Sequence, residues 1–357
     1  MSRLFEPGVI NGLELSNRLV RSATWEGLAD EAGRATEALN RVMVQLAQGG
    51  IGLIIASHTF VRPDGQAGPR QLGLYDDKLI PSFSAMTEAV HQAGGRIVAQ
   101  LTHAGDRAET KLTKAPAMGP DQAGLDDIRA LQEAYILAAG RAKKAGFDGI
   151  QLHSAHGYLI NQFISPALNH RDDDYGGGLE NRARFALEVL AGVRREVGPD
   201  YPVLIKINGR DYLSGGLTID QSSRICTLLA RAGLDAIEVS GGNPKGDQLP
   251  SRKGITSPDK EAYHRAEAEA IKKAVDIPVM VVGGIRSFEV AEALLTDGAA
   301  DYVSLCRPLI REPDLAARWQ AGDRRPATCH SDSLCFKPIL ADQGFYCYLD
   351  REEEDKA

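Results

Sequence analysis

Long hydrophobic runs are missing from the sequence, and no apolar stretch approaches the about 18 residues of a membrane-spanning helix. The N-terminal segment, which begins Met1-Ser2-Arg3, lacks the apolar core of a secretory signal peptide. Lysine and arginine do not gather into a basic run, and the formal net charge is −7, so the electrostatic footprint of a nucleic-acid-binding protein is also missing. We therefore expect a cytoplasmic protein with no nucleic-acid and no membrane partner.

Cysteine is scarce: five residues in a chain of 357 do not make a disulfide framework. The sequence also lacks a G-x-G-x-x-G string between a strand and a helix, which is the fingerprint of an open dinucleotide-binding sheet. The nearest approach, Gly50-Ile51-Gly52, precedes a predicted strand instead of following one. This absence argues against an open doubly wound sheet, which is the main competing architecture.

What the sequence does contain is a set of eight short aliphatic runs, separated by segments with the 3.6-residue periodicity of helices. Runs that are apolar at nearly every position are typical of strands buried on both faces of a parallel sheet. Eight strand–helix repeats predict an α/β fold in the form of a single (β/α)8 TIM barrel. The runs are Leu19–Ala23, Leu53–Ala56, Ile97–Leu101, Gly149–His153, Val203–Ile207, Ala236–Ser240, Val279–Val282 and Tyr302–Leu305.

Additions are expected at both ends of this barrel. Before the first strand, the turn pair Asn11-Gly12 predicts an N-terminal β-hairpin that covers the bottom of the barrel. We assign the barrel to residues 1–311. A short C-terminal extension, with a helix and a cysteine-containing tail, takes residues 312–357.

Polar side chains gather where the fourth predicted strand ends, at His153, His156 and Tyr158. In a barrel enzyme the loops that follow the strands carry the chemistry. An imidazole can donate a hydrogen bond to an oxygen that gains negative charge, and a phenol can deliver a proton. Taken alone, these three residues fit a reaction centre no better than they fit a metal pair or simple polar packing.

A longer set of strings surrounds these residues. The strings are Asn17-Arg18-Leu19-Val20, Gln100-Leu101-Thr102-His103-Ala104-Gly105, His153-x-x-His156-Gly157-Tyr158-Leu159, Asn169-His170-Arg171, Tyr175-Gly176-Gly177 and Glu180-Asn181-Arg182-x-Arg184-Phe185. Together they resemble the Old Yellow Enzyme family of FMN-dependent oxidoreductases. The resemblance runs from about Leu4 to about Arg311 and implies that residues 1–311 form a (β/α)8 barrel that binds FMN non-covalently.

The resemblance implies a role for each residue of the reaction centre. His153 and His156 resemble the pair that binds the carbonyl or nitro oxygen of the substrate, and Tyr158 resembles the proton donor to the carbon α to that group. Trp25 is expected to border both flavin and substrate. Many members have Thr or Cys at this position, so the indole is expected to change the pocket and the flavin potential. His58 stays open between a ligand contact and a packed histidine.

The resemblance also implies the residues that hold FMN. Gln100 resembles the residue at the pyrimidine edge of the flavin, and its amide can both donate and accept hydrogen bonds there. Lys206 lies in an apolar strand, where an unpaired charge is costly, and resembles the cation beside flavin N1. The backbone at the end of the first strand is expected to lie along the flavin, at Ser22, Ala23, Thr24 and Trp25. Two later loops are expected to hold the phosphate, at Gly283, Gly284, Cys306 and Arg307. The family usually has glycine at the position of Cys306.

Three cysteines near the end, Cys329, Cys335 and Cys347, resemble the iron–sulfur site of the dienoyl-CoA reductases and trimethylamine-dehydrogenase-like relatives. A [4Fe–4S] cluster usually requires four thiolates, and Asp332 stands at the second position here. We expect a degenerate remnant that binds no metal. An Asp-ligated cluster and adventitious zinc are the alternatives.

Together these features imply an FMN-dependent NAD(P)H oxidoreductase that reduces electron-poor alkenes conjugated to a carbonyl or nitro group. Hydride would pass from flavin N5 to the β-carbon, with the proton supplied by Tyr158. One alternative is an FMN-dependent dehydrogenase or demethylase of amines or hydroxylated compounds, and another is an FMN-binding protein without turnover. The expected partners are NAD(P)H as a transient hydride donor and a small-molecule substrate, and a homo-oligomer is compatible with the sequence.

Overall fold

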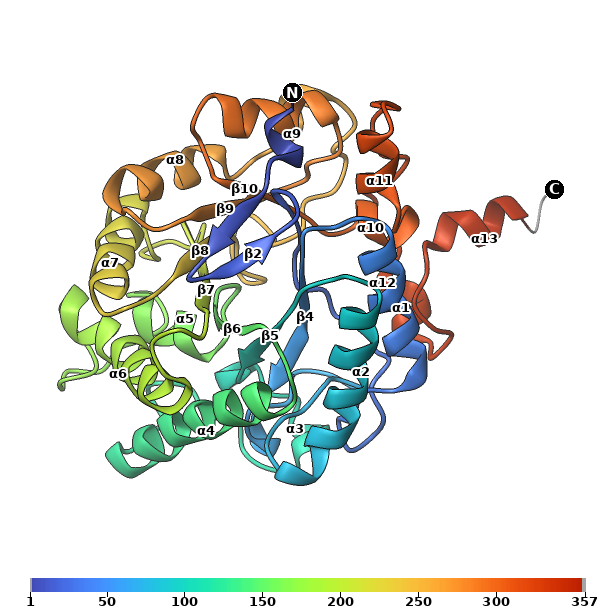
Figure 1. Ribbon diagram of the computed structural model, residues 1–357. Helices are drawn as coiled ribbons and strands as arrows, with labels where there is room; N and C mark the ends of the chain where they lie inside the picture. The colour runs from blue at the N-terminus through green and yellow to red at the C-terminus, as the bar shows by residue number, and fades with distance from the viewer. Residues whose placement is uncertain (1, 355–357) are drawn as a thin grey trace.

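Eight parallel strands close into a barrel in the computed structural model, which describes residues 2–354 (Figure 1). The strands follow one another around the barrel in chain order, and the last returns to pair with the first. The predicted (β/α)8 TIM barrel is therefore confirmed. Its strands are β3 (Leu19–Arg21), β4 (Leu53–Phe60), β5 (Ile97–Thr102), β6 (Gly149–Ser154), β7 (Val203–Asn208), β8 (Ala236–Ser240), β9 (Val279–Val282) and β10 (Tyr302–Leu305).

Five strands differ from their predicted bounds: β5, β6 and β7 each end one residue later, and β3 and β4 differ by more. The sequence predicts a first strand that runs to Ala23, whereas β3 ends at Arg21. The N–H of Ser22 still makes a strand-type hydrogen bond of 2.8 Å to β10, and the chain then leaves the sheet. β4 continues to Phe60, past its predicted end, because residues 72–74 fold back and hydrogen-bond the backbone of Phe60 on both sides.

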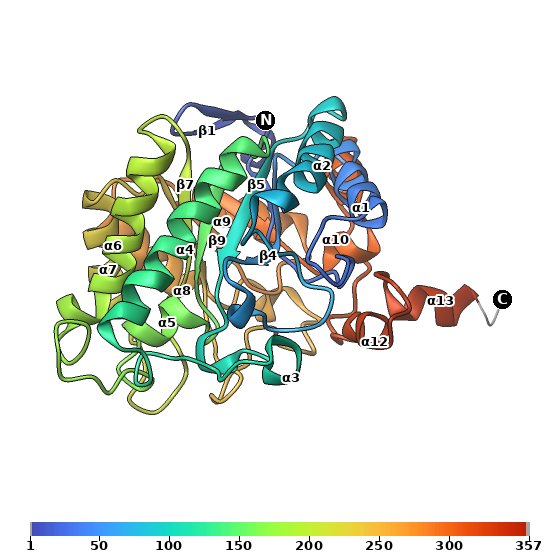
Figure 2. The same cartoon turned by 90° about the horizontal axis from the view of Figure 1, so that it is seen from below.

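The helices surround the barrel and alternate with its strands (Figures 1 and 2). Polar caps fix where several of them begin: Thr36 accepts a hydrogen bond from the N–H of Leu39 at the start of α1, and Thr218 does the same for Gln221 in α7. No helix within residues 2–354 is long and apolar enough to cross a membrane. The main helices are α1 (Glu37–Gln48), α2 (Ile80–Gln92), α4 (Leu125–Lys144), α5 (Leu159–Ile164), α6 (Leu179–Val197), α7 (Ile219–Arg231), α8 (Arg265–Ala274), α9 (Phe288–Thr296), α10 (Pro308–Arg311) and α11 (Leu315–Gln320).

The N-terminal hairpin, β1 (Gly8–Ile10) and β2 (Leu13–Leu15), lies at one end of the barrel (Figure 2). Its turn residues Asn11 and Gly12 have φ values of 44° and 78°, as a type I′ turn requires. Ile10 and Leu15 are buried in one apolar cluster with residues from inside the barrel. The hairpin therefore closes this end, as the sequence predicts, and leaves the opposite end for the site.

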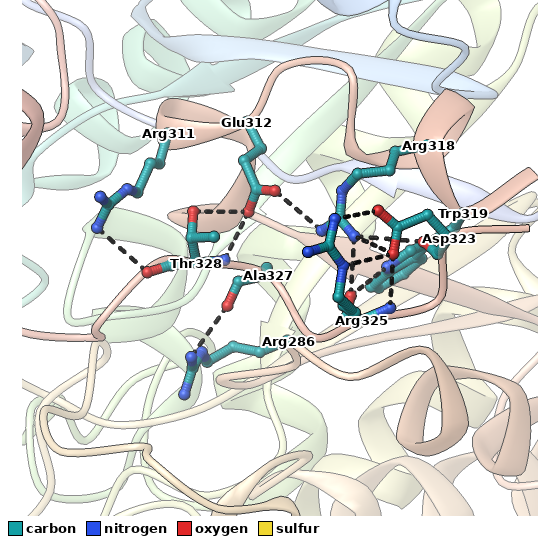
Figure 3. A network of polar contacts seen from close by, with 9 residues as sticks. All are labelled: Arg286, Arg311, Glu312, Arg318, Trp319, Asp323, Arg325, Ala327 and Thr328. Atoms are coloured by element: carbon teal, nitrogen blue, oxygen red, sulfur yellow. Dashed lines mark hydrogen bonds and ion pairs between the residues drawn. The ribbon is translucent and has the colours of Figure 1, made fainter. Parts of the chain in front are cut away.

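After α11 the chain crosses the outside of the barrel and is held there by a polar network (Figure 3). The carboxylate of Glu312 accepts hydrogen bonds from the backbone N–H of Thr328 over 2.6 Å and from Arg318 over 2.9 Å. Arg286, which follows β9, donates to the carbonyl of Ala327 over 3.0 Å. These contacts fix the start of the C-terminal segment, which continues into α12 (Phe336–Leu340) and α13 (Tyr348–Glu354).

Candidate active site

A cavity of about 550 Å³ lies where the carboxyl ends of the barrel strands meet. All eight strands contribute to its wall, through a residue within the strand or directly after it. The predicted site residues line it together, except Gly283, whose neighbour Gly284 does. The strand residues in the wall are Ser22, His58, Gln100, His153, Lys206, Ser240, Val282 and Ser304.

His153, His156 and Tyr158 are brought together by a tight turn that follows β6. His156 and Gly157 have φ values of 62° and 76°, and these two left-handed residues turn the chain back over the strand end. The ring of His153 then lies 5.4 Å from the ring of His156 and 4.7 Å from that of Tyr158, between centroids. Asn161 in α5 fixes the turn, since its side-chain oxygen accepts from the N–H of Gly157 over 2.7 Å.

Burial controls the charge of these groups. It holds the pKa of both His153 and His156 well below the usual range, and the positive charge of Lys206 acts in the same direction. Burial also lowers the pKa of His58, to about 4, and raises the pKa of the Tyr158 hydroxyl. At neutral pH the imidazoles are therefore uncharged and the phenol keeps its proton, so all of them can act as neutral hydrogen-bond donors.

A chain of polar side chains runs through the barrel beneath the cavity. Gln100 donates to Gln151 over 2.7 Å, and Gln151 donates to Glu238 over 3.0 Å. The ammonium of Lys206 lies 3.3 Å from the same Glu238 carboxylate and donates to the Ser22 hydroxyl over 2.6 Å. Four neighbouring strands, together with Ser22 directly after β3, therefore hold Gln100 and Lys206 in place, and a buried carboxylate balances the charge of Lys206.

Buried polar groups without partners show that the cavity suits a polar ligand. The hydroxyl of Ser304 and both ring nitrogens of His264 line it, and no hydrogen-bond partner for them exists among the described residues. Burial lowers the pKa of His264 to about 3, so this imidazole is uncharged. A ligand with several donors and acceptors would satisfy these groups, which would otherwise cost free energy.

One end of the cavity suits an anionic group. Arg307 is only 8% exposed, donates to the Ser333 hydroxyl over 3.1 Å and forms no ion pair with a carboxylate within residues 2–351. At Gly284, φ is 68° and an added Cβ would lie 2.7 Å from the ring of Tyr263, so glycine lets the backbone approach where a side chain would not fit. A buried cation beside an open glycine backbone is a donor set that fits the phosphate of FMN.

Several lining residues escape the sequence analysis. Arg107 lies two residues after the Gln100–Gly105 string, so its position in the sequence could have indicated it. His264 and Tyr263 end a long irregular loop that has no periodic pattern. Residues of α12 also line the cavity. The local sequence could not predict this part of the wall, because it depends on a contact between distant parts of the chain.

The terminal cysteines do not gather around a common centre. Cys335 lines the cavity, Cys329 is buried nearby, and Cys347 lies beside Asp350. Burial raises the pKa of the Cys335 thiol to about 12 and also raises that of Cys329, so both keep their protons. Among the residues that the structure describes, no group of three or more His, Cys, Asp or Glu side chains is arranged to hold a metal ion.

A closed (β/α)8 barrel with this cavity at its carboxyl end defines a barrel enzyme whose site accommodates a flavin. The model of the NADH:flavin oxidoreductase / NADH oxidase family matches residues 3–325, and the chain belongs to that family. The resemblance to Old Yellow Enzyme is thereby confirmed. The cofactors of this family are FMN and NADH or NADPH.

Individual relatives agree with this assignment. The chain is 37% identical to the NADH oxidase of Thermoanaerobacter brockii over 89% of its own length and 51% of that protein, so it spans about half of that relative. It is 36% identical to the NADPH dehydrogenase of Bacillus pumilus, over 87% of its own length and 92% of that enzyme.

Two solved structures are also similar. A 2-naphthoyl-CoA reductase superimposes with a TM-score of 0.90 and 25% identity, over 97% of this chain and 56% of that one. An Old Yellow Enzyme homologue from Zymomonas mobilis does so with a TM-score of 0.78 and 26% identity, over 92% and 95% of the two chains.

Proposed function

We propose that the protein reduces a carbon–carbon double bond that is conjugated to a carbonyl or nitro group, with NADH or NADPH as the electron source. One observation carries the proposal: two uncharged imidazoles, His153 and His156, face the same cavity as the protonated phenol of Tyr158. When bound, FMN supplies the hydride chemistry that side chains lack. Similarity to an NADPH dehydrogenase and to an Old Yellow Enzyme homologue supports the same reading.

The residues that would hold FMN come from several strand ends. Gln100 would bind the pyrimidine edge of the cofactor, and Lys206 would stabilise the negative charge that the reduced cofactor carries. Gly283, Gly284 and Arg307 would hold its phosphate. The remaining contacts would come from Ser22, Ala23, Thr24, Trp25 and Cys306, where the Thr24 hydroxyl lies 3.1 Å from the Cys306 sulfur.

His153 and His156 would act on one part of the substrate and Tyr158 on another. His153 and His156 would donate hydrogen bonds to the substrate oxygen, and such bonds strengthen as that oxygen gains negative charge. The Tyr158 hydroxyl has no acceptor among the described residues, so its proton is free for the carbon α to the activating group. Nε2 of His156 lies 2.8 Å from the Ser240 hydroxyl, and this hydrogen bond fixes the orientation of the imidazole. Trp25 would border the substrate.

Anaerobic half-reactions test the proposal, with Tyr158→Phe as the matched variant. We expect NADH or NADPH to bleach the flavin absorbance of both proteins at similar rates. Reoxidation of the reduced protein by 2-cyclohexenone should be about 10²- to 10⁴-fold slower in the variant, because only the proton donor is lost. A colourless protein that cannot be reconstituted with FMN would contradict the proposal, as would a reduced protein that no enone or nitroalkene reoxidises.

A further inference from the structure

Arg107 is a cation in the wall of the cavity beside the reaction centre. It ends the short 3-10 helix Gly105–Arg107 that follows β5. Its guanidinium carbon lies 4.9 Å from the centroid of the Tyr158 ring, and one nitrogen donates to the carbonyl of His156 over 2.5 Å. A group bound against Tyr158 would therefore also lie close to the guanidinium.

This cation has no counter-charge within the described residues, in contrast to its neighbours. Lys206 is paired with Glu238, Arg21 with Glu26 and Arg62 with Asp64, whereas Arg107 forms no ion pair within residues 2–351. Arg286 and Arg307 are the other two arginines of the wall that form no ion pair with residues 2–351, and they follow β9 and β10, at the end assigned to the phosphate. The positive charge of Arg107 is thus left for whatever occupies the substrate end.

The two carboxylates closest to Arg107 in the sequence have other partners. Asp106 accepts from Gln162 over 2.6 Å and lies 3.5 Å from the ammonium of Lys245. Glu109 accepts from the backbone N–H of Lys111 over 3.3 Å at the start of the next short helix. Neither of them forms an ion pair with the guanidinium, although Glu109 also lines the cavity.

We propose that Arg107 binds a carboxylate of the substrate, so that the alkene reduced at this site is an anion. This inference rests on the proposed function. His153 and His156 take the activating oxygen at one end of the conjugated system, and Arg107 takes the carboxylate at the other. A guanidinium suits this task because its planar set of N–H donors can bind both oxygens of a carboxylate.

A matched pair of substrates tests the proposal: (E)-6-oxo-4-heptenoate and its methyl ester. Both contain the same enone, and two methylene groups separate it from the carboxylate, so the pair differs in charge and hardly in reactivity. For the unmodified protein we expect kcat/KM to be about tenfold or more higher for the acid than for the ester, mainly through a lower KM. In Arg107→Met this ratio should fall to about one.

The ratio also separates substrate binding from any positioning of Tyr158 by Arg107, because a misplaced phenol slows both substrates equally. Arg107→Lys keeps the charge without the planar donors and should give an intermediate ratio. Lys245→Met removes an exposed cation from the same end of the barrel and should leave the ratio unchanged. Flavin content, measured by absorbance, checks that each variant is folded.

Two results would overturn the inference: a ratio at or below one in the unmodified protein, or a ratio that Arg107→Met leaves unchanged while both rates fall together. Failure of the proposed function looks different. In that case the reduced protein would be reoxidised by neither compound nor by 2-cyclohexenone.

Discussion

At this reaction centre, burial sets the pKa of single residues, and it shifts the pKa of the imidazoles and that of the phenol in opposite directions. Burial disfavours the charged form of each group, so it lowers the pKa of His153 and His156 and raises that of Tyr158. Arg107 opposes the shift of Tyr158, because its positive charge favours the phenolate. All three groups therefore keep one protonation state across the physiological range.

The pH dependence of alkene reduction should reflect this. Groups with a lowered pKa take up a proton only in acid, so we expect no inflection of the oxidative half-reaction near ~pH 6.5, the value of an ordinary histidine. The alkaline decrease, caused by loss of the Tyr158 proton, should lie above ~pH 10. In Arg107→Met it should move to still higher pH, because the cation that favours the phenolate is gone. Stopped-flow reoxidation across this range checks the profile, and a clear step near ~pH 6.5 would contradict it.

At this scale the sequence predicts most of the residues that the cavity gathers. His153, Gln100 and Lys206 could be predicted from the sequence because each lies in a strand, and the strand ends of a barrel meet at one place. Their roles remain proposals. His264 was not accessible, because its position depends on how a loop of more than twenty residues folds back, and such a loop has no periodic signal.

Among the elements, α12 has the most direct effect on the shape of the site. Ile339 and Leu340 line the cavity, and Arg70 holds the helix end through the carbonyl of Ile339 and through Asp342 over 3.0 Å. A Cβ added to Gly27, whose φ is 63°, would lie 2.4 Å from a methyl group of Ile339. The first barrel loop thus meets the last part of the chain with no spare room.

We expect Gly27→Ala to displace α12 and open the cavity wall. The segment after Ala327 should become more sensitive to limited proteolysis, and KM for apolar enones should rise several-fold. Gly12→Ala is the matched control: its φ of 78° imposes a similar backbone strain of about 1–2 kcal/mol, yet nothing lies within 4 Å of the added carbon. Equal proteolysis of the two variants would show that contact with α12 is not what matters.

The elements themselves were well predicted where burial imposes a pattern. Eight strands buried on both faces gave eight apolar runs, and the turn pair at Asn11-Gly12 gave the hairpin. The end of β4 was not predicted, because Phe60 is held by a loop that comes later in the sequence. The position of α12 against the barrel could not be predicted either, because it also depends on contacts with residues distant in the sequence.

At the scale of the whole molecule, the C-terminal segment is attached to the barrel through α11. Trp319 in this helix is 1% exposed and packs edge-on to Phe288 with 5.8 Å between ring centroids. It also donates to the carbonyl of Arg325 over 3.2 Å (Figure 3). Its indole therefore joins the outer helices to the segment that leads to α12.

Trp319→Ala should lower the free energy of unfolding by about 3–5 kcal/mol, because a large buried side chain is lost and leaves a cavity. Thermal unfolding of the FMN-loaded protein, followed by circular dichroism, measures the effect. Trp319→Phe keeps much of the buried volume but loses the hydrogen bond to Arg325, so it should unfold between the other two proteins. An unchanged melting temperature for the alanine variant would show that α11 does not stabilise the barrel.

The pairing of β10 with β3 sets the order in which the protein can mature during synthesis. β3, the first strand of the barrel, stays unpaired on one edge until β10 (Tyr302–Leu305) has been synthesised, almost three hundred residues later. Until that strand has left the ribosome, both edges of a seven-stranded sheet are open, and such edges favour aggregation. The wall formed by α12 follows later still. A nascent chain therefore gains a complete binding site only after Leu340, the last residue of α12, has been translated.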